Sequence, residues 1–201
     1  AMYTAFNRSN FQQEIFELYH DLITFGTAAM FIEEDEEDFI KFSTRHIDEV
    51  YIAENDKGRI DTIYRRFNLS ARAVVQKFGT AVSQDILVLE KKDPYKEVEI
   101  VHAVYPRADF DPNKKDKKNM PFESVYMEYK NGNELSVSGF KEFPFVVPRY
   151  LKASHEIYGR SPAMTALPDV KMLNEMVKTT IKAAQKQVDP PLLVPDDGFL
   201  L

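Results

Sequence analysis

The chain has 201 residues, a formal net charge of −6 at pH 7 and no cysteine. This length supports one sizeable hydrophobic core, so one domain is expected. Without cysteine there is no disulfide framework, no thiolate metal site and no cysteine nucleophile, as is common for proteins of a reducing compartment. The mild acidity argues against a general nucleic-acid coat, and no apolar run approaches the roughly 20 residues that a membrane span requires.

Neither end of the sequence resembles a natural boundary. The N-terminus shows no targeting pattern, because a helical pattern begins almost at once. The C-terminus stops inside the apolar run Gly198 to Leu201. We therefore expect a fragment of a longer protein.

The first predicted element is a helix from about residue 11 to 25. Ser9 and Gln12 have the spacing of a capping box, and Gly26 stands where a glycine commonly ends a helix. Between them, apolar residues recur at alternating four- and three-residue steps and form one stripe: Phe11, Ile15, Leu18, Leu22 and Phe25.

Strands follow this helix. Residues 27–33 and 39–44 alternate with a period of two around an acidic turn, and residues 50–53 and 59–67 flank the turn sequence Asn55-Asp56-Lys57-Gly58. Two short helices are predicted next, with Ser70 and Ser83 as N-caps and ends near Gly79 and Lys92.

The strand pattern returns at residues 98–104, 125–129 and 135–140. Asn131-Gly132 favours a mirror-image two-residue turn, and residues 143–150, which contain Pro144 and Pro148, are expected at a sheet edge. The predicted fold class is therefore α+β, with a mainly antiparallel sheet, flanking helices and a long C-terminal helix.

The C-terminal third has helical signals. Ser161 with Pro162 predicts a first turn, and Pro168 predicts the start of a second helix of about 20 residues, about 30 Å long, ending at Asp189. On a helical wheel one half of this second helix is apolar: Leu173, Met176, Val177, Ile181, Ala184 and Val188. The other half carries a stripe of lysines: Lys171, Lys178, Lys182 and Lys186.

Signals for catalysis are weak. No glycine has the context of a phosphate-binding loop, and the four histidines (His20, His46, His102 and His155) lack the spacing of a zinc protease, so each is interpreted as a surface or structural residue. The acidic run 33–38 could bind a divalent cation, but consecutive carboxylates usually form a solvated loop. No catalytic residue, metal site or cofactor is predicted.

Two basic clusters could contact phosphate or an acidic partner. The first is a loop cluster of Lys114, Lys115, Lys117 and Lys118, for which a flexible charged loop is the favoured interpretation because no aromatic residue is interleaved. The second is the lysine stripe of the C-terminal helix, whose spacing places the charges on one face. The pattern alone favours a solvated face over a nucleic-acid surface.

Several segments are more specific. Residues 156–164 (EIYGRSPAM), 167–174 (LPDVKMLN) and 182–192 (KAAQKQVDPPL) closely resemble portal, or head-to-tail connector, proteins of short-tailed phages of the podovirus type. Residues 103–107 (AVYPR) and 144–150 (PFVVPRY) also resemble this family, so the resemblance covers most of the chain.

The resemblance implies a structural ring subunit of the virion, not an enzyme. Such rings, commonly of twelve subunits assembled in the host cytoplasm, occupy one capsid vertex and pass double-stranded DNA; their partners are terminase, capsid or scaffold proteins and tail adaptors. By analogy residues 1–160 correspond to a partial wing, 161–190 to the first stem helix and 191–201 to the start of the clip. The rest of the clip, a second stem helix and any crown would lie outside this chain.

The resemblance also gives the C-terminal helix a role. It implies that the lysine stripe, in particular Lys178, Lys182 and Lys186, faces the DNA channel, while the apolar half packs on neighbouring helices. The alternative is a non-viral α+β interaction module whose lysine helix binds an acidic partner. A carboxylate metal enzyme built on residues 33–38 is a third, weaker hypothesis.

Overall fold

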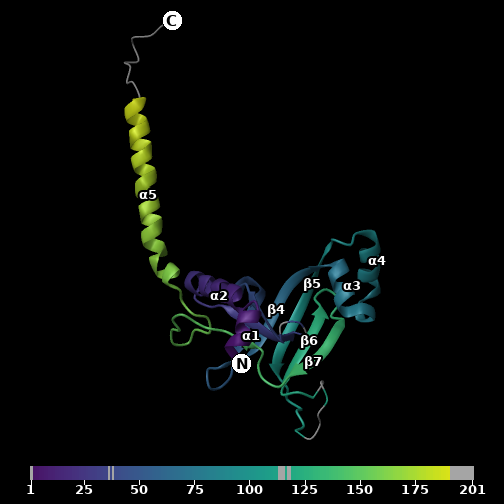
Figure 1. Cartoon of the computed structure of the whole chain (residues 1–201). Coiled ribbons are helices and arrows are strands. Elements are labelled where there is room, and N and C mark those ends of the chain that lie inside the picture. Colours follow the sequence, from purple (N-terminus) through teal and green to yellow (C-terminus); the bar gives the residue numbers. More distant parts are fainter. Residues whose placement is uncertain (1, 36, 38, 113–115, 117–118, 191–201) are drawn as a thin grey trace.

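The computed structural model describes residues 2–35, 37, 39–112, 116 and 119–190. Two antiparallel sheets and four helices form a body, and a fifth helix, α5, projects away from it (Figure 1). The predicted α+β class is confirmed.

The N-terminal part of the body joins two helices to a small sheet. Helices α1 (Met2–Arg8) and α2 (Phe11–Phe25) precede a three-stranded sheet in the order β2-β1-β8. Its strands are β1 (Ala29–Asp35), β2 (Phe39–Arg45) and β8 (Phe145–Val146). The buried side of α2 packs against this sheet through a cluster that contains Leu18, Ala28, Met30 and Phe42, with Leu22 at its margin.

The ends of α2 differ in how well they were predicted. Gly26 ends the helix with φ 78°, and its N–H donates to the Leu22 carbonyl at 3.0 Å, as expected. The capping-box prediction is wrong, because Asn10 is the N-cap residue and α1 occupies the preceding turn. The Ser9 hydroxyl donates to the Phe6 carbonyl, while the Asn10 side chain bonds the backbone of β2.

The larger sheet has five strands in the order β3-β4-β5-β6-β7. They are β3 (Val50–Glu54), β4 (Ile60–Ser70), β5 (Glu97–Pro106), β6 (Phe122–Glu128) and β7 (Glu134–Phe140), with a 3-10 turn η1 (Ile47–Glu49) before β3. Between β4 and β5 the chain forms α3 (Ala71–Phe78), η2 (Gly79–Ala81) and α4 (Gln84–Lys92).

Both α3–α4 and the small sheet pack on the large sheet, and the inward side chains of the large sheet form two core clusters. One lies under α3 and α4 and contains Phe67, Val74, Ile86, Ile100 and Leu135. The other lies against the small sheet and contains Phe31, Ile52, Ile63, Val104 and Phe145. Alternation along β4 and β5 supplies both clusters from one face of the sheet.

The two predicted serine caps behave differently. The Ser70 hydroxyl accepts a hydrogen bond from the Ala73 N–H at 3.3 Å and caps α3. Ser83 occupies the N-cap position of α4, but its hydroxyl makes no capping bond. It donates instead to the buried Glu128 carboxylate at 2.8 Å, which also accepts from the Ser83 N–H.

Glu128 also explains why the predicted two-residue turn at Asn131-Gly132 is wrong. Strand β6 ends at Glu128 and β7 begins at Glu134, so residues 129–133 form a longer connection. Gly132 has φ 65°, but Asn131 lacks the positive φ that a mirror-image type I turn requires. The side chains of Asn131 and Asn133 donate to the Glu128 carboxylate, which holds the longer loop in place.

The predicted strand 143–150 is reduced to β8, two residues long, at the edge of the small sheet. The edge position was predicted correctly. Pro144 and Pro148 have no N–H to donate, which limits the ladder, yet their carbonyls accept from Ile32 and Ala28 at 2.9 and 3.2 Å.

The C-terminal helix is one helix, α5 (Pro162–Val188), and not two. The Ser161 cap and Pro162 at the start were predicted correctly, whereas Pro168 lies inside the helix instead of starting a new one. A proline in the second turn of a helix removes one backbone hydrogen bond but does not have to end the helix. With 27 residues, α5 is about 40 Å long.

Candidate assembly surface on the C-terminal helix

A compact set of hydrogen bonds fixes the base of α5 to the body. The Ser161 hydroxyl accepts from the Met164 N–H at 2.9 Å and donates to the Thr24 carbonyl at 2.8 Å. The Gly159 N–H donates to the Thr27 hydroxyl at 2.7 Å. Ser161 therefore caps α5 and attaches it to the end of α2.

Two glycines let these backbones approach each other. A Cβ on Gly26 would lie 2.5 Å from the carbonyl carbon of Arg160, and a Cβ on Gly159 would overlap the Gly26 carbonyl oxygen. A second set of contacts supports the same segment, because Arg149 and Lys152 both pair with Glu54, and Arg149 also donates to the Ile157 carbonyl at 3.0 Å. Backbone contacts and side-chain contacts at its base thus hold α5 against the body.

Beyond this base α5 is exposed on every side. Residues 163–190 are all exposed, although the helix carries many large apolar side chains. Met176 is 59% exposed and Val188 87% exposed. All six residues of the apolar half expected from the sequence share this exposure: Leu173, Met176, Val177, Ile181, Ala184 and Val188. No other part of the described chain covers this apolar half.

The lysines of α5 are exposed as well. Lys171, Lys178, Lys182 and Lys186 follow the helical spacing that places them opposite the apolar half. Lys178 forms an ion pair with Glu175 at 3.0 Å. Lys182 and Lys186 form no ion pair within residues 119–190 or the rest of the described chain. The lysine face therefore presents net positive charge.

Sequence reasoning missed part of the apolar surface at the base of α5. Met164, Leu167 and Val170 are each 48% exposed, and Ala163 and Ala166 are exposed beside them. Met164 and Leu167 were overlooked because Pro168 was expected to start a separate helix. On the continuous helix, Ala163, Ala166 and Val170 extend the apolar half of α5 down to the body, whereas Met164 and Leu167 lie on the side of the lysines.

The structure separates His102 from the other three histidines. His102 is buried in β5, where its ring stacks on Tyr126 at 3.9 Å and its Nε2 lies 2.9 Å from the Ser124 hydroxyl. Burial, with a smaller contribution from the nearby Lys77 charge, lowers the pKa of His102 to about 3. His102 is therefore a neutral core residue, and the other three histidines lie elsewhere.

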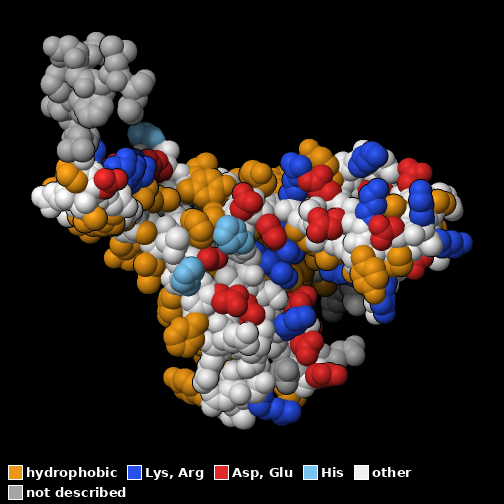
Figure 2. Space-filling view, turned by 90° about the horizontal axis from the view of Figure 1, so that it is seen from above, with side chains coloured by type: hydrophobic (Ala, Val, Ile, Leu, Met, Phe, Trp, Pro, Cys, Tyr) orange, Lys and Arg blue, Asp and Glu red, His pale blue; other side chains and the backbone are white. Residues whose placement is uncertain are grey.

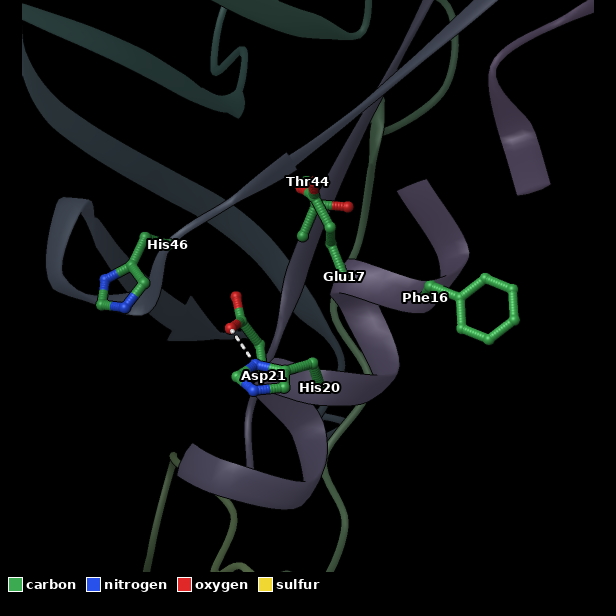
Figure 3. Close-up of a pocket in the computed structure, with 6 residues that line it drawn as sticks. All are labelled: Phe16, Glu17, His20, Asp21, Thr44 and His46. Carbon is green, nitrogen blue, oxygen red and sulfur yellow. Dashed lines mark ion pairs between the residues drawn. The ribbon is translucent and has the colours of Figure 1, made fainter. Parts of the chain in front are cut away.

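An open groove of about 560 Å³ lies beside α2. Figure 3 shows the six residues that line it: Phe16, Glu17, His20, Asp21, Thr44 and His46. The Nδ1 atom of His20 lies 3.8 Å from Oδ1 of Asp21, and the rings of His46 and Phe25 meet edge to face. The groove brings two histidines and two carboxylates to one side of α2 without converging them on a point.

The remaining predicted sites lie wholly or partly outside the described residues. The loop lysines Lys114, Lys115, Lys117 and Lys118 lie outside the described residues, as do Glu36 and Asp38 of the acidic run. Among the described residues, no group of three histidine, aspartate or glutamate side chains is placed to hold a metal ion. In the same part of the chain, no helix is both long and apolar enough to cross a membrane.

Comparison with known proteins places these features in a family. The family model for the bacteriophage head to tail connecting protein matches residues 1–200. The chain is 36% identical over 199 residues to the portal protein of Salmonella phage epsilon15 and 33% identical over 198 residues to the probable portal protein of Bordetella phage BPP-1. Each alignment covers 96% of this chain but 36% of the relative, so the chain spans about a third of their length. The chain belongs to the bacteriophage head-to-tail connecting protein family.

Proposed function

We propose that this chain is part of a subunit of the phage portal ring, a structural assembly at the capsid vertex through which double-stranded DNA enters and leaves. The observation that carries the proposal is α5, a 27-residue helix that projects from the body with an apolar half and a lysine face, both exposed. Family membership supports the portal role.

The apolar half of α5 is proposed as the contact between subunits. Burying apolar surface stabilises an assembly by about 25 cal/mol per Å², and side chains as exposed as Leu173, Met176 and Ile181 gain this only from residues outside the described chain. Their spacing suits helix-on-helix packing. Neighbouring copies of α5 around a ring, commonly twelve in this family, supply such helices.

The lysine face of α5 is proposed to line the channel. A channel in which DNA slides requires weak contacts that do not depend on base sequence, and lysine–phosphate contacts have this character. Lys182 and Lys186 are the best candidates because they form no ion pair in the described chain, whereas Lys178 forms an ion pair with Glu175. Lys171 continues the stripe toward the body.

The proposed setting follows from the same role. The ring is assembled in the host cytoplasm, becomes part of the virion at the junction of head and tail, and meets terminase, capsid or scaffold proteins and a tail adaptor. The lysine loop (Lys114, Lys115, Lys117 and Lys118) is a candidate for one of these protein contacts. The role is structural, with no catalytic residue, metal or cofactor proposed.

The test replaces Lys178, Lys182 and Lys186 together by Gln in the full-length protein. Because the lysines lie opposite the apolar half, ring counts by electron microscopy should match wild type. Genome retention should fall, and its dependence on salt should become shallower, since fewer phosphates are neutralised. The matched control replaces Lys91, Lys92 and Lys96, which are exposed at the end of α4 and just after it.

Two outcomes contradict the proposal. Loss of rings in the triple variant alone would make the lysines interface residues. Intact rings with unchanged DNA retention at every salt concentration would leave a solvated face. The alternative module, a lysine helix that binds an acidic protein, is favoured if the unmodified full-length protein forms no ring at all.

A further inference from the structure

Helix α2 has a second apolar face that points away from the core. Phe16 is 75% exposed, and Tyr19 and Ile23 are each 54% exposed. Their spacing of three and four residues places them on one side of α2, next to the side that holds Leu18 and Leu22 against the small sheet. We call Phe16, Tyr19 and Ile23 the outer face of α2.

No element of the described chain covers this face. Scattered exposed apolar residues are ordinary on a protein surface, but three large ones on one side of a 15-residue helix form a stripe. Figure 2, viewed from above, shows hydrophobic side chains gathered around α5 and over the adjoining part of the body. The apolar surface thus continues from α5 onto the body.

The position of α2 determines what can meet its outer face. The C-terminal end of α2 is bonded to the base of α5 through Thr24 and Ser161, so α2 lies at the level of the first turns of α5 (Figure 1). At this level the apolar half of α5 presents Ala163, Ala166 and Val170, all exposed. Small alanines leave room for a large side chain of a facing helix.

We propose that the outer face of α2 packs against the base of α5 of the adjacent copy in the ring. This inference rests on the proposed ring. If α5 runs along the channel, rotation about the ring axis keeps every residue at its own level, so the part of a neighbouring α5 within reach of α2 is its base and not its far end. The contact continues the proposed α5–α5 interface onto the wing and covers both exposed surfaces.

The cysteine-free chain allows a direct test by cross-linking. In the full-length protein, Phe16→Cys is combined with Ala166→Cys or with Val170→Cys, and each pair is treated with a short bifunctional maleimide. A denaturing gel should then show a ladder of cross-linked subunits for at least one pair. The matched control joins Val88→Cys with Val170→Cys, because Val88 is 64% exposed but lies on α4, at the end of the body opposite α5 (Figure 1). This pair should give no ladder.

A second readout uses charge instead of cross-linking. Phe16→Glu should lower the yield of rings at least about tenfold, whereas Val88→Glu should leave it unchanged, because a buried unpaired carboxylate at a contact is costly. Both residues are exposed within the chain, so circular dichroism and the unfolding midpoint should match wild type for both variants.

The outcomes separate this inference from the proposed function. If the wild-type protein forms no ring, the proposed function fails. If rings form but neither Phe16 pair gives a ladder and Phe16→Glu still assembles, only the α2 contact is wrong. A cross-link confined to single subunits would likewise overturn the inference, since it would place the outer face of α2 on α5 of the same chain.

Discussion

His102 is a titratable residue held neutral inside the core. It lies between Tyr126, on which it stacks, and Phe31, whose ring meets its own edge-on at 5.9 Å. The nearby charges are cationic: Lys77 from α3, Arg65 from β4 and Arg45 from β2. Protonation would add a fourth positive charge with little water to solvate it, which is why the pKa of His102 falls to about 3.

This pKa predicts how stability depends on pH. In the unfolded chain a histidine binds its proton near pH 6.5, but in the fold only near 3. The unfolded state therefore binds more protons below pH 6.5, and stability is lost as pH falls through this window. Between pH 7 and 5, His102 should remove about 2 kcal/mol from the free energy of unfolding.

The check is urea denaturation of wild type, His102→Phe and Ile100→Val between pH 7 and 5. His102→Phe should lose the part of the slope that corresponds to about one proton. Ile100→Val, a buried control in the same strand, should lower stability equally at each pH. An unchanged slope in His102→Phe would mean that the fold does not lower the pKa of His102.

The sequence predicted which face of its strand His102 occupies, but not which residues surround its side chain. Its alternation with Ile100 and Val104 placed all three on one face of a strand, and this is what the structure shows. The partners Ser124 and Tyr126 depend on the register between β5 and β6, which are separated by a long loop. Local pattern carries no information about that register.

The junction of α2 and α5 holds the base of α5 against the body. Gly26 and Gly159 come from distant parts of the chain and touch through their backbones. Gly26 requires a left-handed conformation as well, with φ 78°, whereas Gly159 does not. A side chain at Gly26 would therefore meet both backbone strain and a steric clash, whereas a side chain at Gly159 would meet the clash alone.

Alanine at each glycine should reveal this difference. Gly132 is the matched control, because it has φ 65° and nothing within 4 Å of an added Cβ. Gly132→Ala should cost about 1 kcal/mol, from left-handed strain alone. Gly159→Ala should cost about 1–3 kcal/mol from overpacking alone, and Gly26→Ala should combine both costs. Equal losses for Gly26→Ala and Gly132→Ala in denaturant unfolding would show that the backbones do not touch.

The predictions for the elements failed where a residue has a side-chain partner, or lies within a continuing helix, that the local sequence pattern does not reveal. Ser83 was correctly placed at the start of α4, but its hydroxyl donates to Glu128, which is 45 residues away. Asn131 had the sequence of a tight turn, yet Glu128 binds its side chain. Pro168 was read as a helix start, although the helix begun at Ser161 continues through it. Local sequence patterns therefore predicted where these elements lie, but not their side-chain partners or all of their boundaries.

For the whole molecule, the sequence predicted the fold class and the amphipathic character of α5, but not the division into two sheets. Strand β8 returns from residue 145 to pair with β1, a connection across more than a hundred residues that no local pattern specifies. The directions proposed for the two faces of α5 are predictions. They follow from exposure, charge and family membership together.

A reconstruction of the full-length protein by cryo-electron microscopy would show where α5 lies in the assembly. We expect a closed ring in which α5 helices surround the channel, with Leu173, Val177 and Ile181 against the neighbouring subunit and Lys182 and Lys186 toward the lumen. A ring in which α5 lies away from the channel, or in which these lysines are buried between subunits, would contradict this expectation.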